Sequence, residues 1–259
     1  MGLDLVKLAG ELRRGRDIPP TVLEDNACRA LIYFSFPTLL PFTKKRLAIS
    51  AVDGAGELQK YLFRPLVAAT GRPDIEKVMN DLRGRNITED DCEQFFSSIL
   101  DSDAFLFAVD GDQAYKELDL GGEPIDKSYP YQEIALAQFA QNITAYKKLN
   151  NSSPRPRGFG LLITKTDKIV NVMDEKPDTK KLEEFTGEYL RGGWSAMSSL
   201  CHCYRIQPNL FYHRLHPLKS KNPNDPKQKY EIEKSPGRSM IKYPVDQYDA
   251  IIDWFNSLA

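Results

Sequence analysis

The sequence has little of what marks disulfide-rich, membrane-spanning or nucleic-acid-binding proteins. Its 4 cysteines in 259 residues are too few and too unevenly spaced for a disulfide framework, so we expect reduced thiols in a cytoplasmic protein. No apolar run approaches the length that crosses a bilayer, and residues 1–16 lack the apolar core of a signal peptide. The 35 basic and 36 acidic residues leave a net charge of −1, without the basic excess that binds phosphate backbones. We expect no membrane span and no nucleic-acid partner.

Histidine is also scarce, and all 3 histidines fall in one short stretch with two of the cysteines. The residues of this stretch are Cys201, His202, Cys203, His213 and His216. A structural zinc site needs four such ligands in a tetrahedron, and the C-x-C and H-x-x-H spacings match no common zinc pattern. No turn typical of a cysteine nucleophile accompanies them either. We interpret them as buried thiols and surface imidazoles, and keep a metal- or thiol-dependent activity as a third possibility.

Strand-like and helix-like stretches alternate along the chain after residue 46. Short runs rich in β-branched and aromatic residues predict strands at 29–36, 46–52, 104–109, 159–163 and 209–215. Helical spacing of apolar residues predicts helices at 3–15, over most of 57–101, and at 132–149, about 179–200 and 245–258. This alternation predicts an α/β fold, a doubly wound and mostly parallel sheet with helices on both faces.

We find no internal repeat and treat residues 1–259 as a single domain. Two polar stretches rich in glycine, proline or charge, near 111–131 and 217–242, are predicted to be mobile loop insertions. Asp110 and Asp112 in the first of them could be metal ligands, but we interpret them as a turn at a strand end.

Two polar turns directly follow buried strands. Asp53 ends the strand at 46–52, with Gly56 three residues later, and Thr164-Lys165-Thr166-Asp167 follows the strand at 159–163. In doubly wound sheets, ligands bind beyond the carboxyl ends of the strands. A carboxylate such as Asp53 can hold Mg²⁺ directly or through water. The backbone N–H of Gly56 can approach a terminal phosphate because no side chain blocks it.

The second turn suits a guanine base. The carboxylate of Asp167 can accept two parallel hydrogen bonds, one from the ring N–H and one from the amino group of guanine, and adenine does not offer this pair. The aliphatic stem of Lys165 can lie along the face of the ring. The two turns together indicate a site for a guanine nucleotide.

With these motifs in this order, the sequence resembles the Ras-like P-loop GTPases. Asp53-Gly54-Ala55-Gly56 looks like the family's D-x-x-G motif, and Thr164-Lys165-Thr166-Asp167 looks like its [NT]-K-x-D motif. The order of predicted elements follows the family over nearly the whole chain. Within the family, the turn "AVDGAGE" looks closest to a large-insertion group of prokaryotic GTPase domains, in which x-D-x-A-G-E is common.

The resemblance implies binding of GTP or GDP with Mg²⁺ and a role for each matching residue. Asp53 and the switch threonine Thr21 would serve Mg²⁺, and Gly56 would sense the terminal phosphate. Glu57 stands where many members carry the glutamine that positions the attacking water. The remaining matches would bind the guanine base, and they are Thr164, Lys165 and Asp167.

The family's phosphate loop, G-x-x-x-x-G-K-[ST], occurs nowhere in residues 1–259. In the family it lies between the first strand and the first helix. Because residues 3–15 read as that helix, we expect the strand and the loop upstream of this chain, so the Ras-like fold is N-terminally incomplete. The first strand of the family lies between the strands that here end at Asp53 and Asp110, so both would have unpaired backbone groups.

We therefore expect GTP hydrolysis only where the upstream phosphate loop is present, with weak or absent nucleotide binding by this chain alone. A degenerate GTPase with a rearranged sheet would also lack the loop, and so would a protein of a different family altogether. The alternative function is a pseudo-GTPase, a protein-interaction module with an unknown protein partner and no nucleotide hydrolysis.

Overall fold

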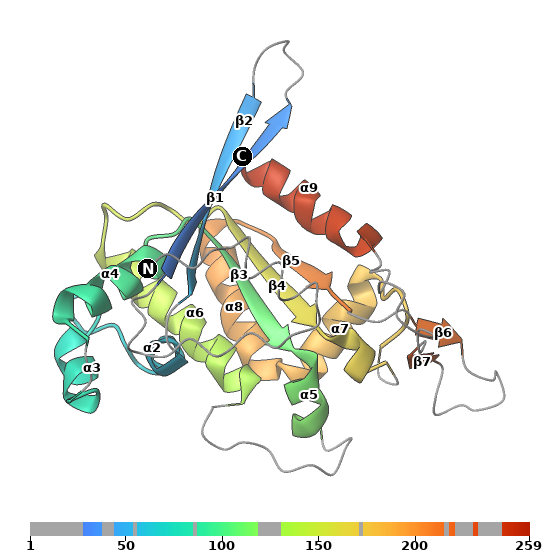
Figure 1. Ribbon diagram of the computed structural model, residues 1–259, viewed down its shortest axis with the longest axis horizontal. Coiled ribbons are helices and arrows are strands. Elements are labelled where there is room, and N and C mark those ends of the chain that lie inside the picture. Colours follow the sequence, from blue (N-terminus) through green and yellow to red (C-terminus); the bar gives the residue numbers. More distant parts are fainter. Residues whose placement is uncertain are drawn as a thin grey trace. The chain divides into compact units, whose positions relative to one another are not determined.

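The computed structural model describes residues 28–37, 44–53, 56–84, 87–118, 131–170, 173–214, 218–220, 230–232 and 245–259. The chain, whose helices and strands are labelled in Figure 1, divides into two compact units. The first unit comprises Met1–Ser102 and Gln141–Pro154, and the second comprises Asp103–Ala140 and Arg155–Ala259. Helix α6, Gln132–Leu149, begins in the second unit and ends in the first. The prediction of one domain over 1–259 stays a prediction.

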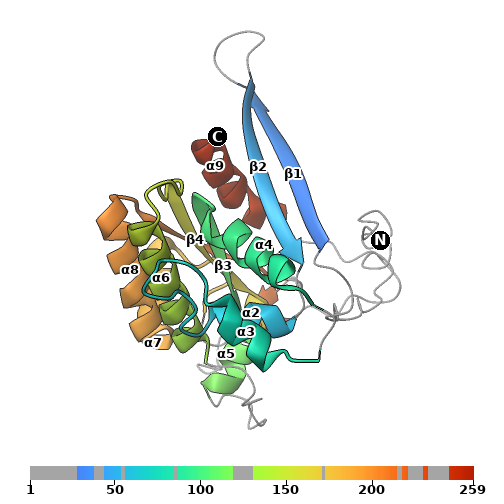
Figure 2. The same cartoon turned by 90° about the vertical axis from the view of Figure 1, so that its left-hand side faces the viewer.

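A long antiparallel pair of strands, three further helices and the end of α6 form most of the described part of the first unit. Strands β1, Cys28–Pro37, and β2, Lys44–Asp53, pair with Ile32 opposite Ile49 (Figure 2). This confirms both predicted strands. The helices are α2 Gly56–Leu62, α3 Ile75–Asp81 and α4 Glu89–Leu100.

The start of α4 and the packing of α6 show how the sequence fixes this unit. At α4, Thr88 Oγ1 accepts from Asp91 N at 3.2 Å while the Asp91 carboxylate accepts from Thr88 N at 3.1 Å, a reciprocal capping box. In α6, the buried Asn142 donates to the carbonyls of Leu62 and Arg64 at 2.9 and 2.8 Å. Its Oδ1 accepts from Leu66 N at 3.2 Å, so one amide satisfies three backbone groups of the turn after α2.

The second unit contains a three-stranded parallel sheet in the order β3-β4-β5. Its strands are β3 Ala104–Asp110, β4 Gly158–Thr164 and β5 Pro208–Tyr212. The register places Asp110 opposite Thr164 and Ile163 opposite Tyr212. The α/β prediction is confirmed at this coarse level, since three strands lie parallel and alternate with helices.

Helices of the second unit cover both faces of this sheet. On one face, the Phe139 ring of α6 packs edge-on against Phe105, with the ring centroids 5.9 Å apart. On the other face, the Trp254 ring of α9, Asp249–Leu258, lies 5.5 Å from the Phe211 ring. A side chain at Gly160 would collide with Phe211 and Trp254, so glycine lets α9 approach the strand closely.

The other described elements of this unit are α5 Gly111–Glu117, η1 Thr166–Lys168, α7 Thr179–Tyr189, α8 Arg191–Tyr204, β6 Leu218–Ser220, β7 Tyr230–Ile232 and η2 Val245–Tyr248. Two predictions were wrong here. The loop expected from residue 111 begins as α5, because Asp110 caps that helix by accepting from Asp112 N at 2.8 Å. The single helix expected at 179–200 is two helices, since Leu190 leaves helical geometry at φ −105° and ψ 11°. The predicted helix at 3–15 lies outside the described residues.

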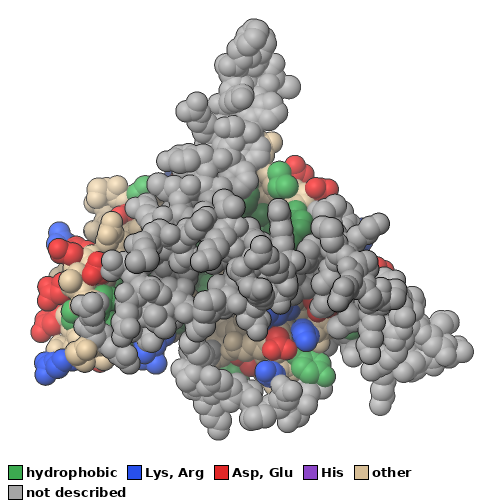
Figure 3. Space-filling view, viewed as in Figure 1, with side chains coloured by type: hydrophobic (Ala, Val, Ile, Leu, Met, Phe, Trp, Pro, Cys, Tyr) green, Lys and Arg blue, Asp and Glu red, His purple; other side chains and the backbone are tan. Residues whose placement is uncertain are grey.

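Within these described ranges, no helix is both long and apolar enough to span a membrane. On the face seen in Figure 3, acidic and basic side chains of the described residues are intermingled. This mixture accords with the near-zero net charge.

Candidate functional site

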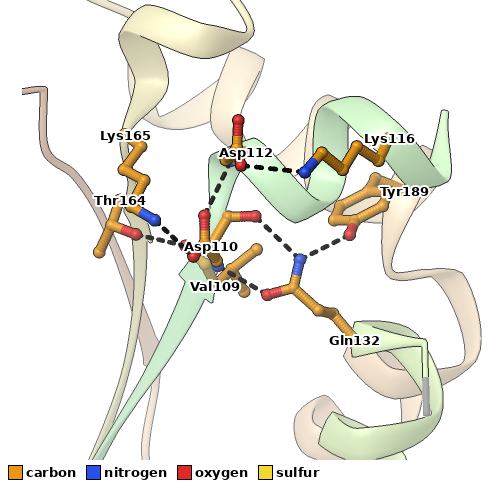
Figure 4. A network of polar contacts seen from close by, with 8 residues as sticks. All are labelled: Val109, Asp110, Asp112, Lys116, Gln132, Thr164, Lys165 and Tyr189. Atoms are coloured by element: carbon orange, nitrogen blue, oxygen red, sulfur yellow. Dashed lines mark hydrogen bonds and ion pairs between the residues drawn. The ribbon is translucent and has the colours of Figure 1, made fainter. Parts of the chain in front are cut away.

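The predicted base-binding turn lies at the carboxyl edge of the parallel sheet. Thr164 ends β4 opposite Asp110, the last residue of β3 (Figure 4). On the other side of β4, His213 follows β5 and donates its backbone N–H to the Ile163 carbonyl at 2.8 Å. Residues 164–167 therefore stand between the ends of the two neighbouring strands, where ligands bind in α/β sheets.

Lys165 adopts an unusual backbone conformation in this turn. Its φ of 50° and ψ of 40° are left-handed, a region that costs a residue with a side chain roughly 1–2 kcal/mol. The turn is closed by a hydrogen bond from Lys168 N to the Lys165 carbonyl at 2.9 Å. The Lys165 ammonium lies 2.7 Å from Asp110 Oδ2, and both side chains are 41% exposed. Beside it, Thr164 Oγ1 donates to the Val109 carbonyl at 2.9 Å.

The second half of the turn is buried. Thr166 donates both its backbone N–H and its hydroxyl to the His213 carbonyl, at 3.0 and 3.2 Å. Asp167 is only 3% exposed. Burial lowers the pKa of His213, and the nearby Asp167 carboxylate opposes that shift. The His213 Nε2 lies 2.6 Å from the hydroxyl of Tyr248.

A network of polar side chains holds Asp110 from the side away from β4 (Figure 4). The buried Gln132 accepts from Asp110 N at 2.6 Å and donates to the Asp110 carbonyl at 3.0 Å. Gln132 also donates to the hydroxyl of Tyr189 at 2.7 Å, and this hydroxyl donates to Glu117 Oε2 at 2.5 Å. Burial raises the pKa of Tyr189, and the contact with Glu117 raises it further, so the phenol stays protonated and acts as a donor.

Gly111 brings the start of α5 against the turn. A Cβ at this position would collide with the carbonyl oxygens of Thr164 and Lys165. Only glycine permits this approach, so the conformation of the turn depends on the residue that follows Asp110.

The other predicted site residues belong to the first unit or lie outside the described residues. Asp53 is the last residue of β2, and Gly56 and Glu57 are the first two residues of α2. A strand end followed by a helix start is the setting predicted for this motif, although the side chains of Asp53 and Glu57 are not described. Thr21 lies outside the described residues.

Among the described residues of the cysteine and histidine stretch, the structure gathers no metal site. Cys201 is buried in α8, whereas Cys203 is exposed near the end of the same helix. Burial raises the pKa of Cys201 to about 11, which disfavours the thiolate that binds metal. In the part of the chain that the structure describes, no three His, Cys, Asp or Glu side chains gather as a metal site would require. His216 lies outside that part.

The structure also shows contacts that local sequence patterns did not indicate. Asp110 was interpreted as a turn residue, and its pairing with Lys165 was not anticipated. The one local indication was the Asp-Gly pair at the end of the strand, because the other predicted motif begins with the same pair, Asp53 and Gly54, at the end of its strand. Nothing local in the sequence links Gln132 or Tyr189 to Asp110.

Comparison with protein-family models, curated proteins and solved structures gives no match for this chain. The residues themselves and their geometry therefore carry the functional interpretation.

Proposed function

We propose that this chain is the guanine-recognising part of a Ras-like, GTP-binding switch domain. The observation that carries the proposal is the turn at 164–167, which follows a buried parallel strand and stands at the carboxyl edge of the sheet. A lysine and a carboxylate in this turn, two residues apart, offer the two contacts that a guanine base needs.

Each residue of the turn has a defined task in this proposal. Asp167 accepts hydrogen bonds from the ring N–H and the amino group of guanine, and hydrogen bonds to a charged acceptor are the strong kind. The stem of Lys165 covers the face of the base. The hydrogen bond from Thr164 Oγ1 to the Val109 carbonyl ties the start of the turn to β3.

In this proposal, the phosphate loop comes from a segment that adds a strand to β3. Among the described strands, β3 pairs only with β4, and Leu106 on β3 is 41% exposed. Gln132 satisfies the backbone of Asp110 on the open side, which leaves the part of the edge near Leu106 and Ala108 for a further strand. An apolar strand that ends in G-x-x-x-x-G-K-[ST] would occupy this edge.

The remaining roles follow from the resemblance alone. Asp53 and Thr21 would serve Mg²⁺, while Gly56 and Glu57 would act at the terminal phosphate. Hydrolysis is expected only with the phosphate loop in place, because backbone N–H groups and the loop lysine hold the phosphates. The output would be ordering of the segments near Thr21 and 56–65.

One observation favours the alternative, a pseudo-GTPase that serves as an interaction module for a protein partner. Asp167 is 3% exposed and Lys165 is paired with Asp110, so the turn already satisfies its charges internally. A turn of this kind can be retained for the fold alone. The two functions differ in whether guanine is preferred over adenine.

Substitution of Asp167 by alanine tests the assignment. Displacement of a fluorescent GDP analogue from the protein that includes the upstream phosphate loop should favour GDP over ADP by about 100-fold, the value expected for two hydrogen bonds to a carboxylate. Asp167→Ala should remove that preference, and Asp178→Ala, which changes a helix cap elsewhere in the unit, should keep it. An unchanged preference in Asp167→Ala would refute the base-recognition role.

The origin of the phosphate loop has a separate test. The coding sequence directly upstream of Met1, read in frame, should encode an apolar strand followed by G-x-x-x-x-G-K-[ST]. A stop codon or an unrelated sequence there would make the interaction module the preferred function.

A further inference from the structure

The backbone N–H, the carbonyl and both carboxylate oxygens of Asp110 each have a polar partner. Its backbone N–H and carbonyl are both bound by Gln132. Its Oδ1 caps α5 by accepting from Asp112 N at 2.8 Å, and its Oδ2 faces the Lys165 ammonium at 2.7 Å. The two carboxylate oxygens therefore have separate tasks, one in the helix cap and one in the turn.

Stability alone does not account for the Lys165 pair. Both side chains are 41% exposed, and exposed ion pairs typically contribute only about 0–1 kcal/mol. The pair instead fixes the direction in which the Lys165 side chain points. Lys165 adopts its left-handed conformation in the turn directly before η1, whereas the other described non-glycine residue with positive φ, Arg205, caps the end of α8.

Asp110 and Gly111 act on the same turn from one side. Gly111 sets the distance, because a Cβ there would strike the Thr164 and Lys165 carbonyls. Asp110 sets the orientation of the lysine side chain. Because Asp110 is itself fixed through Gln132 and Tyr189, its carboxylate is a rigid anchor rather than a mobile counter-ion.

We infer that Asp110 is a positioning residue for guanine-nucleotide binding, which holds the Lys165 side chain in the orientation in which its stem covers the base. This inference rests on the proposed function and deepens it, since it assigns a residue outside the Thr164–Asp167 motif. The negative charge of the Asp110 carboxylate, and not the hydrogen bond by which it caps α5, is the property that positions Lys165.

Two substitutions separate the charge from the cap. Asp110→Asn keeps a good helix cap and removes the charge, whereas Asp110→Glu keeps the charge and is a poorer cap. Asp112→Asn is the matched control, because it removes the same charge two residues away, where the carboxylate pairs with Lys116 at 3.5 Å. Loss of a nearby negative charge should by itself strengthen the binding of an anionic nucleotide. The inference predicts the opposite for Asp110→Asn, namely weaker binding.

The first measurement is dissociation of a fluorescent GDP analogue from the protein that includes the upstream phosphate loop. Asp110→Asn should release it about fivefold faster, the factor that corresponds to about 1 kcal/mol, while Asp110→Glu and Asp112→Asn stay near the wild-type rate. A wild-type rate in Asp110→Asn with faster release from Asp110→Glu would show that the cap matters, and would overturn the inference. Asp110→Ser, which also keeps a capping oxygen, replaces Asp110→Asn if that variant does not fold.

The second measurement needs no nucleotide and keeps the inference distinct from the proposed function. The amides of Thr166 and Lys168 close the turn, through the His213 and Lys165 carbonyls at 3.0 and 2.9 Å. Their hydrogen exchange should be faster in Asp110→Asn than in the wild type and in Asp112→Asn. If the protein that includes the upstream phosphate loop binds no GDP analogue, the proposed function fails, and equal exchange rates in the wild type and the two variants overturn the positioning role independently.

Discussion

The substitution Gln132→Met tests the polar network beneath the candidate site. Methionine has nearly the length of glutamine and keeps the apolar packing, but it has no amide. The change removes three side-chain hydrogen bonds, to the Asp110 N–H, to the Asp110 carbonyl and to the Tyr189 hydroxyl. Buried hydrogen bonds contribute about 1 kcal/mol each, so we expect a loss of about 3 kcal/mol in the free energy of unfolding. For a protein of this size, that lowers the Tm by roughly 6–12 °C.

Urea unfolding followed by tryptophan fluorescence measures this loss. Both tryptophans, Trp194 and Trp254, lie in the second unit, which also contains Gln132, so their emission reports on the relevant part of the chain. The matched control is Gln138→Met, a half-buried position on the same helix and in the same unit, and we expect its stability to change by less than about 0.5 kcal/mol. Equal losses in the two variants would refute the network as a stabilising element.

Three further outcomes follow from the described contacts. Asn142→Ala should destabilise the first unit by about 3 kcal/mol in urea unfolding followed by circular dichroism, because three backbone groups lose their partner, and a loss under about 1 kcal/mol would contradict this. Alkylation read by mass spectrometry should modify the exposed Cys203 before Cys92 and Cys201, since burial raises the pKa of each of these two thiols to about 11, and the reverse order would contradict their burial. Folding lowers the pKa of His213, so the unfolded chain binds its proton more readily and the stability present above about pH 6.5 should fall on acidification. His213→Gln should make that fall shallower between about pH 7 and 5, and an equally steep fall would contradict it.

Local patterns in the sequence were sufficient to predict most elements. The predicted helix at 132–149 has the bounds of α6, and the Thr-x-x-Asp pattern at Thr88, which is typical of a capping box, starts α4. Both depend on nearby residues, helical periodicity in one case and a reciprocal pair three residues apart in the other. The strands at 104–109 and 159–163 were predicted for the same reason, since short continuous apolar runs are typical of strands, and β4 is buried along most of its length while β3 buries alternate side chains.

Contacts between distant residues could not be predicted in this way. The helix α5 was expected as a loop because residues 111–118 are polar, and its start depends on the cap at Asp110. Gln132 and Tyr189 are 57 positions apart and meet at Asp110 only because the fold brings α6, α7 and β3 together. No local sequence pattern indicates a contact of this kind. The guanine motif at 164–167 could be read locally, whereas the anchor of its lysine could not.

The most direct test of guanine recognition is a titration of the ¹⁵N-labelled chain with GDP and, in parallel, with ADP, followed at the backbone amides of Thr166 and Asp167. These amides lie in the turn that the proposal assigns to the base, and Thr166 N is held by the His213 carbonyl at 3.0 Å. The proposal predicts that GDP shifts both resonances in a saturable way and that ADP leaves them in place. Equal shifts with the two nucleotides, or shifts with ADP alone, would contradict guanine recognition by this turn.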